Sequence, residues 1–139
     1  MLLMLEHIIQ SVNNGGKMYR NLYESERYWI EKLLEAEFKE KEILIEQILK
    51  AKVFFEQGYE FISLKFKVEA TPKYPHTVRV PVVMRVFQKD ATPIIFLLHV
   101  INGYIDELEI ITADLSKIEL TTIELDKVEY EIDKEVEVH

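Results

Sequence analysis

The alternation of apolar and polar positions divides the chain into a helical first part and a strand-rich second part. From Ser25 onward the apolar residues recur at the three- and four-residue spacing of a helix, and the phase of this pattern changes near Phe38. This change favours two helices, at about residues 25–36 and 40–50, over the alternative of one long bent helix. After Gly58 the period of the pattern becomes two, which is typical of strands with one solvated face.

The segment 94–111 carries the sharpest local signal. Asn102 and Gly103 stand between two apolar runs, which predicts a β-hairpin with a two-residue turn. If both strands are regular, this turn places His99 opposite Asp106 on one face of the hairpin. The other pairs expected in this register are Leu97/Leu108, Ile95/Ile110, Leu98/Glu107 and Phe96/Glu109.

Further alternating stretches predict a sheet around this hairpin. They cover residues 62–68 and 78–86, and shorter pieces follow at 118–120, 123–125, 128–132 and 136–138. Pro81 indicates an edge strand or a bulge, because proline cannot donate a hydrogen bond to a neighbouring strand. Since the helices precede the strands, we predict an α+β fold, with N-terminal helices packed on one face of a mainly antiparallel sheet of about five to seven strands.

The first 17 residues stand apart from this pattern. Asn13 to Gly16 separates a short apolar opening from the rest, and Met18 follows this break. One interpretation is that residues 1–17 are a translated leader and Met18 is the natural start, since Gly-Gly codons can spell a bacterial ribosome-binding sequence. The other is a short extra helix packed on the domain. In both cases residues 18–139 form a single α+β domain with an acidic C-terminal segment.

The composition limits the chemistry and the compartment. The chain has no cysteine, which excludes disulfides, thiolate catalysis and cysteine-ligated metal sites, and it is typical of a reducing compartment. The first ten residues lack the basic start and the cleavage site of a signal peptide and do not read as a membrane span. We therefore expect a cytoplasmic protein that does not contact a membrane.

The net charge of −8 is concentrated at the C-terminal end. Residues 1–101 hold 14 Lys and Arg against 13 Asp and Glu, whereas residues 102–139 hold 3 against 12. Clustered Lys and Arg are needed to neutralise phosphates, so nucleic acid is excluded as a partner, and a basic protein is favoured. The candidate partner-binding residues are Glu129, Glu131, Asp133, Glu135 and Glu137.

The expected hairpin register supplies the best candidate for chemistry. An aspartate beside a histidine can orient it as a general base, so His99 and Asp106 are candidate catalytic residues. Glu107 is a third candidate, because it shares a strand face with Glu109 and paired carboxylates can exchange protons when burial shifts one pKa. The competing interpretation is a cross-strand pair at the rim of the sheet beside solvated glutamates, and no serine lies in a Gly-x-Ser-x-Gly motif.

The sequence predicts neither a metal nor a cofactor. His7, His76 and His139 are far apart in sequence and none belongs to a His-x-x-His or His-Glu-x-x-His motif. The glycines match neither of the common phosphate-binding spacings.

Two runs carry a resemblance to a known family. LLHVINGYIDELEI at residues 97–110 and MYRNLYESERYWIEKLL at 18–34 resemble an uncharacterised family of small bacterial proteins, a domain of unknown function. Its hairpin has the form LLHV-x-x-Gly-x-Leu-x-Glu-Leu-Glu-Ile. The matching residues are Leu97, Leu98, His99, Val100, Gly103, Glu107, Leu108, Glu109 and Ile110, with Ile105 at a Leu position. The resemblance extends from residue 18 to about 125, implies no activity or cofactor, and excludes the acidic tail.

Two classes of function follow from these observations. The favoured one is a non-enzymatic protein-binding module, like an immunity or inhibitor protein, whose acidic C-terminal surface attracts a basic protein. The alternative is a small hydrolase-like or ligand-binding domain that uses His99, Asp106 and Glu107. A homodimer is a third interpretation, because an exposed alternating strand readily recruits another strand.

Overall fold

The computed structural model describes residues 18–69, 71–118 and 123–139, so the predicted leader or extra helix lies outside the described residues. The described part contains two α-helices, six strands and a short 3₁₀ helix, which confirms the predicted α+β class. The helices are α2 (Glu24–Leu33) and α3 (Lys41–Leu49), close to the two predicted ranges. Among the described residues, no helix has the length and apolar character needed to cross a membrane.

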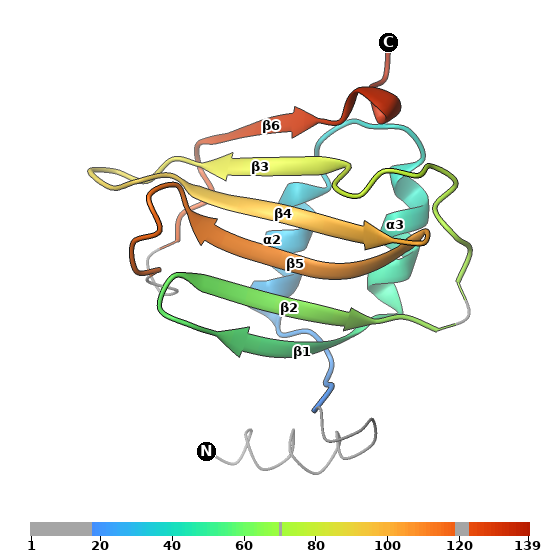
Figure 1. The fold of residues 1–139 in the computed structure, drawn as a ribbon, viewed down its shortest axis with the longest axis horizontal. Coiled ribbons are helices and arrows are strands. Elements are labelled where there is room, and N and C mark those ends of the chain that lie inside the picture. The colour runs from blue at the N-terminus through green and yellow to red at the C-terminus, as the bar shows by residue number, and fades with distance from the viewer. Residues whose placement is uncertain (1–17, 70, 119–122) are drawn as a thin grey trace.

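All strand pairs in the sheet are antiparallel, and the order is β1-β2-β5-β4-β3-β6 (Figure 1). The strands are β1 (Lys52–Gln57), β2 (Phe61–Lys67), β3 (Val82–Val86), β4 (Ile94–Ile101), β5 (Tyr104–Thr112) and β6 (Val128–Ile132). The 3₁₀ helix η2 (Lys134–Val136) follows β6. The β4–β5 hairpin therefore lies in the middle of the sheet, and β1 and β6 are its two edges.

The two helices pack their apolar side chains against the sheet. The buried side of α2 carries Trp29, Ile30 and Leu33, and α2 contacts β3 while α3 contacts β5. In Figure 1 both helices lie behind the sheet. The ring of Trp29 meets that of Phe96 on β4 edge to face, with 6.3 Å between the centroids. Every second residue of the central strands is buried, as a strand with one core face requires.

The predicted hairpin is confirmed, but its predicted register is wrong beyond the first two pairs. Ile101 pairs with Tyr104 and Val100 with Ile105, and a β-bulge then shifts the strands so that His99 pairs with Glu107. Asp106 is therefore the extra residue of the bulge. The pairs that follow are Leu98/Leu108, Leu97/Glu109, Phe96/Ile110 and Ile95/Ile111.

Burial explains this shift. The regular register would place Glu107 and Glu109 beside Leu98 and Phe96, whose side chains are fully buried in the core. A shift of one residue turns both glutamates to the other face and brings Leu108 and its alternate neighbours into the core. Burying two carboxylates costs more free energy than forming one β-bulge. The register of the hairpin is therefore determined by which residues are apolar, and not by the length of the turn.

Other strand predictions need correction. No strand was predicted where β1 lies, because three consecutive apolar residues from Val53 obscure the two-residue period. The predicted strand at 78–86 contains only β3, and β3 is an internal strand; Pro81 lies just before it rather than on an edge. The strand expected at residues 136–138 is absent, since η2 ends at Val136 and residues 137 and 138 are not in a strand, and the described residues 118 and 123–125 are not strands either.

Candidate functional site

A polar cluster lies on the face of the sheet that is turned away from the buried apolar side chains. We call it the sheet-face cluster, and its members are Ser63, Lys65, His99, Glu107 and Glu109. The Ser63 hydroxyl donates a hydrogen bond to Glu107 Oε2 over 2.6 Å, and Lys65 Nζ donates to Glu107 Oε1 over 3.1 Å. His99 Nε2 lies 2.9 Å from Glu109 Oε1. Pairing of β2 with β5 and of β5 with β4 brings these residues together.

The environment of Glu107 favours its charged form. Burial by itself raises the pKa of this carboxyl, but the hydrogen bonds from Ser63 and Lys65, together with the charge of Lys65, lower the pKa below its ordinary value. A carboxylate with a lowered pKa is a weak base, and the Ser63 hydroxyl is directed at this carboxylate rather than at His99. The arrangement therefore differs from that of a serine–histidine–acid triad.

The predicted pairing of His99 with Asp106 is wrong. The β-bulge displaces Asp106 from the position opposite His99, and Glu107 pairs with the histidine instead. His99 is mostly buried, with 15% of its side chain exposed, and its Nδ1 atom is buried without a hydrogen-bond partner among the described residues. The structure thus brings His99 together with Glu107, a predicted candidate, and not with Asp106.

Sequence reasoning missed two members of the cluster. Ser63 and Lys65 alternate with buried residues on β2, so their common face could be inferred from the sequence. Which strand lies beside β2 could not, because β5 is more than forty residues further along the chain. Only the pairing of these distant strands places the Ser63 hydroxyl on Glu107.

The five predicted partner-binding carboxylates lie on or just after the edge strand β6. Glu129 and Glu131 are exposed on β6, and Glu131 Oε2 is 3.1 Å from Arg85 Nη2 on the neighbouring strand β3. Asp133 has a structural role, because its side chain accepts a hydrogen bond from the backbone N–H of Glu135 and caps η2. Glu135 is exposed within η2 and Glu137 ends it.

One side of β6 has no neighbouring strand among the described residues. The backbone N–H of Phe87 donates to Lys127 O, and the backbone N–H of Asp133 donates to Pro81 O. Backbone groups alternate in direction along a strand, so the N–H and C=O groups of the odd-numbered residues of β6 point toward β3. The N–H and C=O groups of the even-numbered residues Val128, Tyr130 and Ile132 consequently point to the outer edge. We call this row of backbone groups the β6 edge.

The β6 edge is held firmly in place. The Tyr130 hydroxyl donates to Lys32 O at the end of α2 over 2.6 Å, and the backbone N–H of Lys39 donates to Val136 O over 2.8 Å. Burial, with the charge of Glu35, raises the pKa of the Tyr130 phenol further above neutral pH, so the hydroxyl is protonated and can donate this bond. At the opposite edge of the sheet, some outward backbone groups already have partners. Arg20 and Val53 on β1 exchange two backbone hydrogen bonds there.

One comparison with known proteins identifies a family that matches most of the chain. The family model described as "Domain of unknown function (DUF6984)" matches residues 19–123, which include both helices and the strands β1 to β5. The match confirms the expected resemblance to a domain of unknown function and ends before β6. Searches of the curated proteins and of the solved structures found no match.

Proposed function

The chain belongs to the DUF6984 family, and because this family is a domain of unknown function, we propose a role from the geometry alone: a protein-binding module. In this proposal the β6 edge pairs with an extended, basic segment of another protein, in the manner of an immunity or inhibitor protein. The observation that carries it is an anchored edge strand whose outer backbone groups have no strand partner among the described residues.

The backbone of β6 supports this form of binding. An extended segment can add a strand to a sheet edge by hydrogen bonds between main chains, while its alternate side chains determine specificity. Val128, Tyr130 and Ile132 present these N–H and C=O groups at regular spacing. Their side chains pack against the core, so the strand is already in the conformation that a partner strand requires.

The charge of the edge supports a basic partner. Glu129 and Glu131 project from the same face of β6, and a strand added beside it would place its own side chains about 5 Å from them. Lysine or arginine at those positions would be favourable. The same argument disfavours a homodimer through two antiparallel β6 strands, because that pairing would set Glu129 of one copy opposite Glu131 of the other.

The hydrolase-like alternative has less geometric support. The Ser63 hydroxyl donates to Glu107 rather than to His99, and Asp106 is displaced from His99 by the β-bulge. A small-molecule role at the sheet-face cluster would have to use His99 and the two glutamates without a serine nucleophile.

The test uses a synthetic peptide of alternating lysine, valine and arginine as the probe and the full chain as the receptor. We expect the peptide to slow amide hydrogen exchange at Val128, Tyr130 and Ile132, and we expect added salt to weaken binding. The double variant Glu129→Gln/Glu131→Gln should bind more weakly. The matched control Glu56→Gln/Glu60→Gln removes the same charge at the opposite end of the strand order and should bind like the wild type.

A second variant tests the backbone part of the proposal. Val128→Pro removes an outward N–H and adds a ring at the β6 edge without removing a hydrogen bond to β3. It should abolish peptide binding while circular dichroism remains native. Equal affinity for a peptide with glutamate in place of lysine and arginine, or protection confined to amides outside β6, would refute the proposal.

A further inference from the structure

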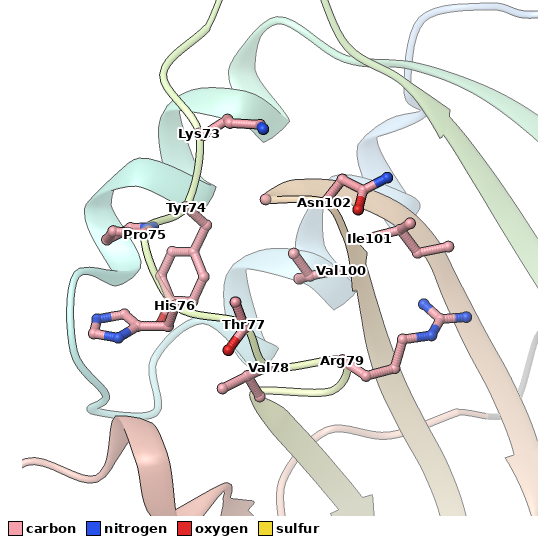
Figure 2. A pocket seen from close by; sticks show the side chains of 11 residues that line it. Lys73, Tyr74, Pro75, His76, Thr77, Val78, Arg79, Val100, Ile101 and Asn102 are labelled. Carbon is pink, nitrogen blue, oxygen red and sulfur yellow. The ribbon is translucent and has the colours of Figure 1, made fainter.

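A second site, unrelated to the β6 edge, lies at the turn of the central hairpin. The loop formed by residues 73–79 runs past residues 100–103 of the β4–β5 turn and leaves a hollow of about 550 Å³ between them (Figure 2). We call this hollow the turn pocket. It is at the end of the sheet opposite to the β3–β4 connection (Figure 1).

The walls of the turn pocket are fixed by hydrogen bonds from one buried side chain. The side chain of Gln47 on α3 is fully buried, and its Nε2 donates to Pro72 O and to Gly103 O, both over 2.9 Å. Its Oε1 accepts from the N–H of Ile105 over 2.9 Å. One amide group thus joins the residue just before the loop to the hairpin turn and to the start of β5.

Two further contacts hold the loop itself. The N–H of Tyr74 donates to Gly103 O over 2.8 Å, and the Tyr74 hydroxyl donates to Lys39 O over 2.6 Å. At the other end of the loop, the N–H of Val100 donates to Arg79 O over 2.7 Å. Because the loop is pinned at both ends, the turn pocket exists before any ligand arrives.

Tight packing against the turn explains why a glycine stands at position 103. Gly103 has a φ of +84°, and a Cβ atom built there would lie 3.0 Å from Tyr74 O and 3.1 Å from the side chain of Lys73. A larger residue would be strained and would also press on the loop. The close approach of loop and turn is therefore part of the pocket's construction.

The turn pocket is lined by positive charges, although the whole chain has a net charge of −8. Lys73 and Arg79 both line it, and no aspartate or glutamate among the described residues does. Neither cation takes part in an ion pair within the described part of the chain. His76 on the loop has a carboxylate partner outside the lining of the pocket, because its Nε2 lies 3.1 Å from Glu40 Oε1.

Neutral polar groups and an apolar surface complete the lining. Figure 2 shows Lys73 extending from the loop toward Asn102, with the guanidinium of Arg79 beside Ile101 on the hairpin side. The Asn102 amide and the Thr77 hydroxyl can donate hydrogen bonds to an oxyanion. Val78 and Ile101 add apolar surface next to these donors.

From this juxtaposition we propose that the turn pocket binds a small organic phosphate. Its phosphoryl group lies at Lys73, on the side of the pocket where the Asn102 amide supplies a neutral donor (Figure 2), because an ammonium suits a dianion. Arg79, on the other side of the pocket beside Ile101 (Figure 2), adds positive potential that attracts the anion. Its organic part lies on Val78 and Ile101. The volume exceeds the needs of inorganic phosphate, which is why an organic group is part of the proposal.

The test uses phenyl phosphate as the probe and phenol and benzoate as matched ligands that lack the phosphoryl group. Binding is followed by amide chemical shifts in the full chain. We expect phenyl phosphate to move the signals of Val78, Arg79 and Gly103, and to bind more tightly than inorganic phosphate or benzoate. Phenol should not bind measurably.

Variants separate this site from a general attraction to cations. Lys73→Gln should weaken phenyl phosphate binding about three- to tenfold, and Arg79→Gln, which removes a charge further from the phosphoryl group, should weaken it by about threefold or less. The control Lys89→Gln removes an exposed lysine in the β3–β4 connection and should leave the affinity unchanged. An equal loss in all three variants, tighter binding of benzoate, or shifts spread over the surface would overturn the proposal. Because the turn pocket and the β6 edge share no residue, the result does not depend on the peptide experiment.

Discussion

Replacing Gln47 by leucine tests how much of the fold's stability depends on one buried amide group. The side chain is fully buried and makes three hydrogen bonds to backbone groups of the loop and of the hairpin. Leucine has a similar volume but no polar atoms. In Gln47→Leu the buried N–H of Ile105 loses its acceptor and Pro72 O loses a donor, whereas Gly103 O keeps the N–H of Tyr74.

The size of the effect follows from these three groups. A buried N–H left without a partner costs about 1–3 kcal/mol, and each lost bond to a partly buried carbonyl costs about 0.5–1 kcal/mol. Burial of the leucine side chain offsets about 1 kcal/mol. We therefore expect the free energy of unfolding of Gln47→Leu to fall by about 1–4 kcal/mol, measured by urea denaturation with linear extrapolation.

Gln88 provides a matched control. Its Nε2 donates to Glu124 O over 2.8 Å and its Oε1 accepts from the N–H of Glu124 over 3.2 Å, but both bonds are exposed to water. Water can replace these bonds, so Gln88→Leu should cost about 0.5 kcal/mol or less. If the two variants lose equal stability, or if Gln47→Leu loses less than about 0.5 kcal/mol, the reasoning from burial is wrong.

Two further predictions concern charged pairs. Because the folded-state pKa of Glu107 is lowered, its ionised form adds stability above its unfolded pKa, and this stability is lost as the pH falls through the folded pKa. Glu107→Gln should flatten the stability profile below about pH 5, measured by urea denaturation at several pH values, and an unchanged slope would contradict the assignment. Arg20 and Glu26 form a bidentate pair with both N···O distances 2.7 Å and side chains only 9% and 3% exposed. Glu26→Gln should therefore cost about 3 kcal/mol of unfolding free energy, and a loss below about 1 kcal/mol would show that the pair contributes little.

Local sequence rules predicted the elements whose signals are local. The helical spacing from Ser25 and the phase change near Phe38 located α2 and α3 within a few residues. Asn102 and Gly103 located the hairpin turn, where both residues have positive φ. The class of the fold followed from the order of helices and strands along the chain.

Features that depend on distant residues could not be predicted in the same way. A two-residue turn is most simply continued by a regular register, but that register would bury Glu107 and Glu109. It is unfavourable only because the hairpin packs against the core, which the hairpin sequence by itself does not reveal. β1 carries three consecutive apolar residues from Val53, which obscure the two-residue period. The sheet-face cluster needs the pairing of β2 with β5, for which no local signal exists.

The position of β6 relative to the family match bears on how the proposed function should be tested. The match ends at residue 123, yet Val128, Tyr130 and Ile132 pack against the core beside β3, whose Met84 is fully buried. β6 therefore has an inward side that stabilises the fold and a separate set of groups that remain available to a partner. Glu129 and Glu131 project from the opposite face, so replacing them changes charge without opening the core. A loss of binding in that double variant, with unchanged unfolding free energy, would thus report on recognition and not on folding.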